Sequence, residues 1–286
     1  MADSSRSDCP VAIFCGGEHV RLGRLAGAQA KSLLVAHDTP LLWRLLDQLR
    51  AAGFERIIAA TTPRLERPIS ESVDHYSRAS PDGVAIEVVA RPEQERGLLF
   101  GLERILGTLS GDRFVLCLGD IFFLANPFPA LREQVDAGAD CLVAAPPAIP
   151  EELALGGIVS TDGDRILAVI ERPTSDFSGR PLRWSGLALS DRTRALADLG
   201  SYLPERTDGG PPGDFFEFQR RRGSALRCVT GPDFVNVNSP DHLLLASLYA
   251  RLEADLAPGD LAQSLEAAAE ALRTELARGP SGDRPA

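Results

Sequence analysis

The chain has 286 residues, of which 44% are hydrophobic and 24% are charged, enough for one large α/β core or for a core domain with a smaller appendage. Its formal net charge of −10 argues against a protein that wraps around nucleic acid, because that role needs a concentrated positive surface. A small phosphorylated substrate is compatible with this charge, since a few arginines converging in a cleft can outweigh it locally.

The cysteines and the N-terminal residues bear on the cellular compartment. Residues 1–8 are polar, and no segment approaches the length of a membrane-spanning helix. Five cysteines, an odd number without metal-type spacing, predict buried reduced thiols rather than a disulfide framework: Cys9, Cys15, Cys117, Cys141 and Cys228. We therefore expect a cytoplasmic protein that contacts no membrane.

The first half of the chain alternates short apolar runs with amphipathic segments, the pattern of βα units on a largely parallel sheet. We expect strands at residues 11–15, 56–61, 84–90, 114–118 and 141–145. We expect helices at residues 40–53, 97–109 and 131–137. The first of these helices carries leucines at helical spacing and ends at Gly53.

The pattern changes after Pro150. Strand candidates at residues 157–160, 166–171 and 184–190, with the turn signal Asp162-Gly163-Asp164, predict an antiparallel or mixed insertion. A helix at 214–222 and strands at 225–230 and 233–238 follow. Ser239 can then cap a long helix that ends near residue 256, and an alanine-rich helix at 262–278 precedes a frayed tail.

The segment GGEHVRLGRLAGAQAK, residues 16–31, directly follows the first strand. The paired glycines Gly16 and Gly17 let the backbone turn sharply and bring its amides against an anion, while Arg21 and Lys31 supply charge for phosphate oxygens. The segment is neither the Rossmann GxGxxG nor the Walker motif, and an ordinary glycine-rich turn is the other interpretation. Lys31 is the only lysine among thirty basic residues, which favours phosphate binding by its compact ammonium.

Asp120 is the second candidate for chemistry. It follows the strand at 114–118, at the carboxyl end where open α/β sheets bind their ligands. A carboxylate there can hold Mg²⁺ against a triphosphate. Taken alone, the residue would be interpreted as a turn or helix-cap aspartate.

Several motifs in order resemble those of the sugar-1-phosphate nucleotidylyltransferase superfamily. The family's GGxGxRL…PK segment, GD metal motif, EKP motif and late acidic or Asn residue correspond here to GGEHVRL with Lys31, LGDIFF at 118–123, IERP at 170–173 and VNVNSPD at 235–241. The match in order and rough spacing extends over about residues 10–250. The chain therefore resembles a divergent member of this superfamily.

With the pattern of elements, the resemblance implies a three-layer α/β/α Rossmann-like fold. Its mixed sheet would be predominantly parallel, with a small antiparallel insertion and C-terminal helices. A catalytic domain would cover residues 1–258, with a nucleotide half at about 9–150 and a sugar-phosphate half at about 151–258. Residues 259–286 would form a C-terminal helix and a frayed tail.

The resemblance also implies a nucleotide site. Gly16 and Gly17 would present backbone amides to the base and phosphates, and Gly97 would belong to the same site. His19 stands where the family usually has glycine. It is interpreted either as a residue that contacts the nucleotide and tunes the choice of donor or as an exposed loop residue without a role.

Charged and metal-binding roles follow from the same motifs. Arg21 and Lys31 would neutralise charge developing on the α-phosphate and the leaving pyrophosphate. Asp120 and Asn236 would hold Mg²⁺ on the α-phosphate. Ala30 replaces the family's proline before the lysine, and Asn236 replaces an aspartate common in the glucose-1-phosphate thymidylyl and uridylyl branches.

The acceptor side is assigned in the same way. Glu171 would contact sugar hydroxyls, Arg172 would contact the sugar-1-phosphate, and Gly157 and Gly186 would allow the sugar to approach closely. Arg172 replaces the lysine of EKP, which keeps the charge but changes its reach. Gln94 lies closer to the following glycine than the base-reading glutamine of the family, so the identity of the base stays open.

The resemblance implies an enzyme that transfers NMP from an NTP to a sugar-1-phosphate, or to a related polyol or cyclitol phosphate, and releases pyrophosphate. The alternative is a non-catalytic relative that binds nucleotides or sugar phosphates. A glycosyltransferase is a weaker interpretation, because Ile121 and Phe122 follow Asp120 where a DxD motif would be expected. The alanine seam within residues 252–275 could pack against a second copy of the chain.

Overall fold

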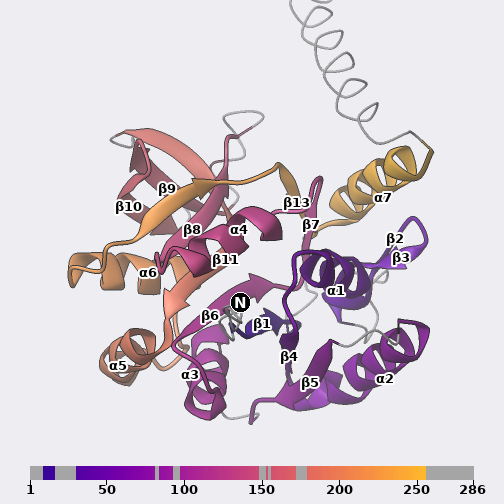
Figure 1. Ribbon diagram of the computed structural model, residues 1–286, viewed down its shortest axis with the longest axis horizontal. Coiled ribbons are helices and arrows are strands. Elements are labelled where there is room, and N and C mark those ends of the chain that lie inside the picture. The colour runs from indigo at the N-terminus through magenta and orange to yellow at the C-terminus, as the bar shows by residue number, and fades with distance from the viewer. Residues whose placement is uncertain are drawn as a thin grey trace, which may run out of the picture.

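The structure, a computed structural model, describes residues 9–16, 30–80, 84–92, 97–147, 153, 156–171 and 179–255. Over this part of the chain it has helices packed around a central mixed sheet (Figure 1). The longer helices are α1 (Leu41–Ala51), α2 (Pro63–Ala79), α3 (Leu98–Thr108), α4 (Phe128–Asp136), α5 (Arg192–Tyr202), α6 (Pro212–Arg221) and α7 (Pro240–Asp255). Two 3₁₀ turns, η2 (Lys31–Leu33) and η4 (Leu203–Glu205), complete the helical elements described.

The central sheet has nine strands in the order β5-β4-β1-β6-β11-β8-β12-β10-β9 within the described residues. Its strands are β1 (Val11–Phe14), β4 (Arg56–Thr61), β5 (Ala85–Ala90), β6 (Arg113–Leu118), β8 (Cys141–Ala145), β9 (Gly157–Asp162), β10 (Arg165–Glu171), β11 (Arg180–Asp191) and β12 (Arg227–Thr230). Strands β5, β4, β1 and β6 are parallel, whereas β11 is antiparallel to β6, β8 and β9. The predicted mixed α/β class is therefore confirmed. The expectation of a predominantly parallel sheet is wrong, because the antiparallel pairings of β9, β10 and β11 extend into the centre of the sheet, where β11 lies between β6 and β8.

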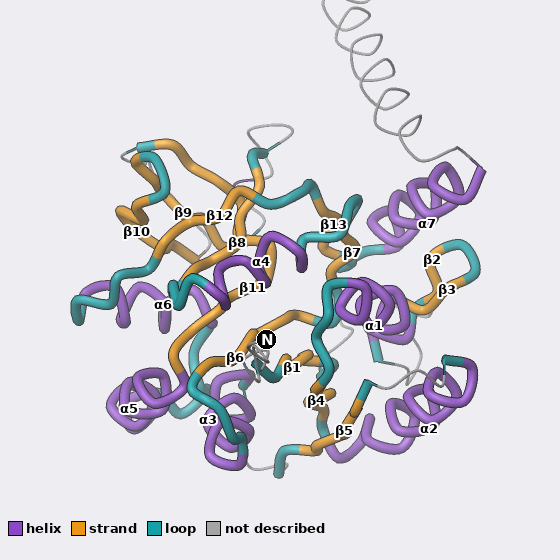
Figure 2. The backbone as a smooth tube through the Cα atoms, viewed as in Figure 1, coloured by secondary structure: helices purple, strands orange, loops and turns teal. Residues whose placement is uncertain are grey.

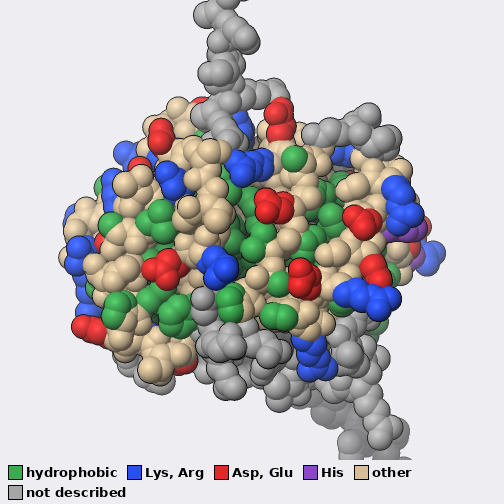
Figure 3. Space-filling view, turned by 90° about the horizontal axis from the view of Figure 1, so that it is seen from below, with side chains coloured by type: hydrophobic (Ala, Val, Ile, Leu, Met, Phe, Trp, Pro, Cys, Tyr) green, Lys and Arg blue, Asp and Glu red, His purple; other side chains and the backbone are tan. Residues whose placement is uncertain are grey.

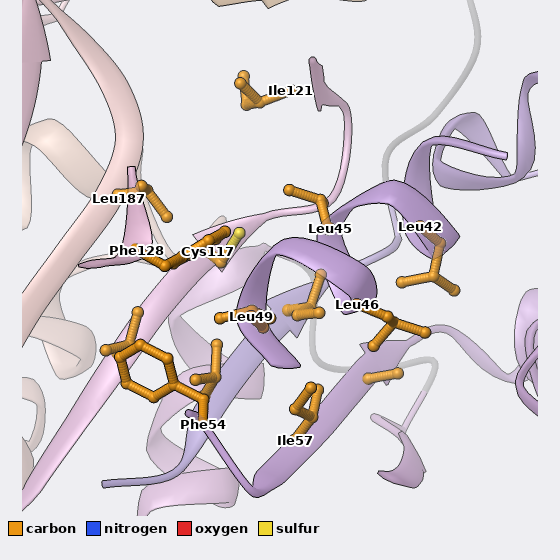
Figure 4. Close-up of a cluster of buried hydrophobic side chains, with 14 of the residues drawn as sticks. Leu42, Leu45, Leu46, Leu49, Phe54, Ile57, Cys117, Ile121, Phe128 and Leu187 are labelled. Carbon is orange, nitrogen blue, oxygen red and sulfur yellow. The ribbon is translucent and has the colours of Figure 1, made fainter. Parts of the chain in front are cut away.

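Helices cover both faces of the sheet. Successive side chains of a strand point to opposite faces, so each face carries apolar residues that pack against helices. In β1, Val11 and Ile13 join a core with leucines and aromatic residues of α1, α2 and α4, while Ala12 joins a second core with α3, α5 and α6. Figure 4 shows part of the first core, where leucines of α1 point toward Phe54, Ile57 and Phe128. The smooth backbone tube in Figure 2 shows the same arrangement of helices around the strands.

A third, smaller core fixes the end of the described chain. The antiparallel pair β7 (Ile121–Phe123) and β13 (Phe234–Asn236) packs with α7 and with the hairpin of β2 (Val35–Ala36) and β3 (Thr39–Pro40). The predicted cap of α7 is confirmed, since the His242 backbone N–H donates to Ser239 Oγ at 3.2 Å. This core ties the residues after Asp120 to those before α7.

Two helices were not expected from the sequence. Helix α2 buries Leu65, Ile69, Val73 and Tyr76 at helical spacing, but Pro68 lies inside it, and an internal proline normally ends a helix. Helix α5 has Asp191 as its N-cap, whose side chain accepts from the Arg194 backbone N–H. The predicted strand at 184–190 is also longer than expected, since β11 begins at Arg180.

Other features of the described residues agree with the expectations from composition. All five cysteines are buried free thiols. Among the residues described, no helix combines the length and apolar character needed to cross a membrane. On the face drawn in Figure 3, acidic and basic side chains are interspersed. The predicted helix at 262–278 lies outside the described residues.

Candidate active site

The carboxyl ends of β1 and β6 lie side by side and form the base of the site. The Gly119 backbone N–H donates to the Phe14 carbonyl at 3.0 Å, and a Cβ atom on Gly119 would lie only 2.9 Å from that oxygen. Glycine is therefore needed for β6 to end this close to β1. The close approach places Asp120 beside the chain that follows β1.

A first cavity of about 240 Å³ opens at these strand ends. Three residues predicted to bind nucleotide line it, namely Gly16, Lys31 and Gly97, together with Asp120, which was predicted to hold Mg²⁺. Gly97, with φ of 101°, caps α3, and a Cβ atom there would lie 2.3 Å from the Asp208 carbonyl oxygen. Both the backbone angle and the space around it require glycine at this position.

A second cavity of about 540 Å³ adjoins the first, because Leu98 and Leu118 line both. The four remaining predicted residues that the structure describes line this second cavity: Gly157, Glu171, Gly186 and Asn236. Gly186 has φ of 77°, and its Cβ would lie 3.0 Å from the Leu118 side chain. The structure thus divides the predicted residues between two connected cavities.

Lys31 lines the first cavity and is hydrogen-bonded to Asn238, which lines the second; this contact, with Asp120 beside it, is called the junction. Lys31 Nζ donates to Asp120 Oδ2 at 3.2 Å and also to Asn238 Oδ1. The Lys31 side chain is 12% exposed and that of Asp120 is 23% exposed. The Lys31 ammonium is therefore mostly buried and is held by two acceptors, Asp120 and Asn238.

The residue before Lys31 keeps the backbone geometry of a proline. Ala30 has φ of −63° and ψ of 141°, and φ near −65° is the value that a proline ring imposes. Ala30 is also fully buried. The replacement of the family's proline by alanine therefore leaves the path of the chain into Lys31 suitable for proline.

Glu171 is oriented by the start of α6. Its Oε1 accepts from the Gly213 backbone N–H at 2.8 Å. A Cβ atom on Gly213 would lie 2.4 Å from that oxygen, so glycine leaves room for the carboxylate. The amino end of a helix favours a negative charge, and the carboxylate is held at the wall of the second cavity.

The buried thiols near the site are not suited to nucleophilic chemistry. Burial raises the pKa of Cys15 to about 12, and burial also raises that of Cys117 well above its usual value. The thiolate, which is the reactive form, is therefore scarce at neutral pH. Among the described residues, no three His, Cys, Asp or Glu side chains are grouped as a metal site.

Several predicted residues lie outside the described part of the chain. These are Gly17, His19, Arg21 and Arg172, together with Gln94 in the segment expected to read the base. Their predicted roles stay predictions.

Sequence reasoning also missed residues that line the cavities. Arg91 and Arg104 line the first cavity, and Arg183 and Trp184 line the second. Arg91 directly follows β5, so the rule that singled out Asp120 after β6 could have found it. Arg104 and Arg183 lie within a helix and a strand and have no comparable signal.

Comparison with known proteins gives one family and one curated relative. Residues 11–201 match the MobA-like NTP transferase domain. A glucose-1-phosphate adenylyltransferase from Anaeromyxobacter sp. (strain Fw109-5) is 41% identical over 74 residues, which are 26% of this chain and 16% of that enzyme. The match thus spans about a sixth of the curated relative's length.

Solved structures with a similar fold cover most of the chain. A protein from Bacillus anthracis assigned as a glucose-1-phosphate thymidylyltransferase, in complex with sucrose, has a TM-score of 0.74 at 18% identity, over 88% of this chain and 98% of that one. A UTP-bound UGPase from Acinetobacter baumannii has a TM-score of 0.70 at 14% identity, over 90% of this chain and 97% of that one. At sequence identities of 14% and 18%, the similarity of these structures to this chain shows a shared fold.

Proposed function

This chain belongs to the MobA-like NTP transferase family, and from that premise we propose that it transfers NMP from an NTP to a sugar-1-phosphate or a related polyol or cyclitol phosphate. The products are an NDP-sugar, or its polyol or cyclitol counterpart, and pyrophosphate. The names of the similar proteins, a glucose-1-phosphate adenylyltransferase and an assigned thymidylyltransferase among them, support this class of acceptor.

The observation that carries the proposal is the pair of adjoining cavities, with Lys31 and Asp120 in the wall of the first and Lys31 hydrogen-bonded to Asn238 in the wall of the second. A transfer between two substrates needs both to be held with their reacting atoms in contact. The first cavity contains the nucleotide candidates Gly16 and Gly97, and the second contains the acceptor candidates Glu171 and Gly157. A protein that bound a single ligand would need only one of these two cavities.

The residues present fit a magnesium ion in their chemistry. Mg²⁺ prefers oxygen ligands and is commonly held by one or two carboxylates together with substrate phosphates and water. Asp120 offers a carboxylate and Asn236 an amide oxygen, and their backbones are adjacent because Asn236 pairs with Ile121. We propose these two residues as the protein ligands. When bound, the ion would neutralise charge on the phosphates.

In the proposed reaction an oxygen of the acceptor phosphate attacks the α-phosphorus of the NTP in line with the leaving group. The new P–O bond forms as the bond between the α-phosphorus and the bridging oxygen breaks, and pyrophosphate leaves with the electron pair. Lys31, at the junction, would stabilise the negative charge on the transferring and leaving phosphates. Glu171 would orient the acceptor through its hydroxyls.

A pyrophosphate-release assay tests the proposal. Each of the common NTPs is combined with a panel of sugar-1-phosphates and polyol or cyclitol phosphates in the presence of Mg²⁺. We expect release with at least one pair, dependent on both substrates. Nucleotide binding without release for any pair would contradict the proposal and would support a non-catalytic binding protein of the same family.

A further inference from the structure

Asn238 forms side-chain hydrogen bonds with both Lys31 and Asn236. Its Oδ1 accepts from Lys31 Nζ, and its Nδ2 donates to Asn236 Oδ1 at 2.7 Å. Its backbone N–H donates to His242 Nδ1 at 3.2 Å. One side chain therefore contacts the lysine that lines the first cavity and the asparagine that lines the second.

The chemistry of the contacts fixes how the Asn238 amide is oriented. An ammonium can only donate hydrogen bonds, so the amide must turn its oxygen toward Lys31. Its NH₂ group then points to Asn236, which must present its own oxygen. The amide orientation of Asn236 is therefore set by Lys31 through Asn238.

We propose that Asn238 is a positioning residue, which holds the Lys31 ammonium at the junction and fixes the Asn236 amide with its oxygen toward Asn238. This inference rests on the proposed function for its effect on turnover. Its structural part, the restraint on Lys31, does not depend on activity. Asparagine suits this role because it is short and both donates and accepts, whereas an ionised aspartate only accepts.

His242 supports the loop that carries Asn238. The first turn of α7 holds His242 in place, because its backbone N–H is bonded to Ser239 Oγ. The imidazole then accepts from the Asn238 backbone N–H, which requires the tautomer with a free lone pair on Nδ1. Val237 fixes the other side, where its backbone N–H donates to the Asp120 carbonyl at 2.9 Å. The loop between β13 and α7 is thus held by backbone hydrogen bonds to Asp120 on one side and to His242 of α7 on the other.

The restraint on Lys31 can be tested without turnover through the reactivity of its amine, because Lys31 is the only lysine of the chain. Reductive methylation with ¹³C-formaldehyde labels Lys31 and the N-terminal amine, and the two products are separated by NMR or peptide mapping. In the Asn238→Ala variant Lys31 loses one of its two acceptors. We expect the labelling rate of Lys31 to rise severalfold while that of the N-terminal amine stays constant.

Kinetics provide the second measurement. For Asn238→Ala we expect kcat to fall about 10- to 100-fold, the usual effect of removing a group that orients a ligand or catalytic residue. We expect KM for the NTP to change little, because Asn238 lines the second cavity and not the first, where the nucleotide is proposed to bind. His242→Ala should lower kcat less, and the double variant should lose less than the product of the two single effects.

Asn238→Asp separates the two contacts. The carboxylate still accepts from Lys31, so the slow labelling of the wild type should be retained. It cannot donate to Asn236, so kcat should remain low. Wild-type kcat in Asn238→Asp would show that the bond to Asn236 has no positioning role.

Asn126 supplies the matched control. Its side chain also makes two hydrogen bonds, donating to the Gln48 carbonyl at 2.8 Å and accepting from the Phe128 backbone N–H at 3.0 Å, and it lines neither cavity. Asn126→Ala should lower the melting temperature without changing Lys31 labelling or kcat. Unchanged labelling and kcat in Asn238→Ala would overturn the inference. If the wild type releases no pyrophosphate, the proposed function fails and labelling alone decides the inference.

Discussion

At the scale of single residues, Lys31 combines a proposed catalytic role with a structural one. Lys31→Ala should abolish pyrophosphate release. It should also lower the free energy of unfolding by about 1–2 kcal/mol, because Asp120 and Asn238 lose a charged hydrogen-bond donor. Assays of release and thermal unfolding of the same preparation measure both effects. A near-normal rate in this variant would remove Lys31 from the mechanism.

Two glycines of the same helical region make a matched pair. Gly97→Ala should destabilise the protein and weaken NTP binding, because the new Cβ would lie 2.3 Å from the Asp208 carbonyl oxygen. Gly107→Ala, near the other end of α3, meets nothing within 4 Å and should stabilise the helix by about 0.5 kcal/mol. Thermal unfolding and isothermal titration with nucleotide measure these effects. Equal behaviour of the two variants would show that the contact with Asp208 is unimportant.

At the scale of elements, Glu217 joins α6 to β10. Burial alone would raise the pKa of Glu217, but hydrogen bonds from Arg220, from the Val169 backbone N–H and from Arg221 outweigh burial and lower the pKa to about 2. A carboxyl group whose pKa is lower in the folded state stabilises the protein at pH values above its pKa in the unfolded chain, which is near 4.5 for Glu217. This contribution is lost as the pH falls from about 4.5 toward 2.

The corresponding prediction concerns the variant Glu217→Gln. Above pH 5 it should be less stable than the wild type, and the difference should shrink steadily as the pH is lowered to 2. Denaturant unfolding at several pH values measures the difference. A gap that stays constant with pH would mean that the charge of Glu217 does not contribute.

The elements also indicate what the sequence could predict. Strands such as β4 and β8 were located to the residue, because each is a continuous apolar run between polar turns. Helix α2 was not expected, although its buried positions repeat at helical spacing. Pro68 lies inside it, and an internal proline normally ends a helix, so the local signals of this segment conflict. The order of the strands could not be read from the chain, since β11 separates β6 from β8 only through pairings between distant segments.

The candidate site was predictable to a similar degree. Asp120 follows β6, so its place at the strand ends could be anticipated, whereas Gly97 was assigned from the family resemblance. The partners of Lys31 could not, because Asn238 lies 207 positions away in the sequence and meets it only after β7 and β13 pair. Hydrogen bonds between distant loops leave no local signal.

At the scale of the whole molecule, the boundary expected near residue 258 can be tested by shortening the chain. A chain that ends at residue 258 keeps α7 and all the residues that line both cavities. We expect it to fold with wild-type stability and to retain turnover. Circular dichroism, thermal unfolding and the release assay check this expectation.

A chain that ends at residue 239 is the control for that experiment. It lacks α7, which covers Phe122, Val235 and Val237 in the third core, and it lacks His242. We expect it to be less stable and inactive. Loss of folding in the chain ending at 258 would instead show that the last residues belong to the core.

Strand β11 has a consequence for synthesis of the protein. It is the strand that bonds to both β6 and β8, yet it is completed only when residue 191 has been made. Until then β6 has an open edge, with unpaired backbone groups that can bind strands of other chains. Slow translation or premature termination before this point should therefore yield aggregation-prone fragments.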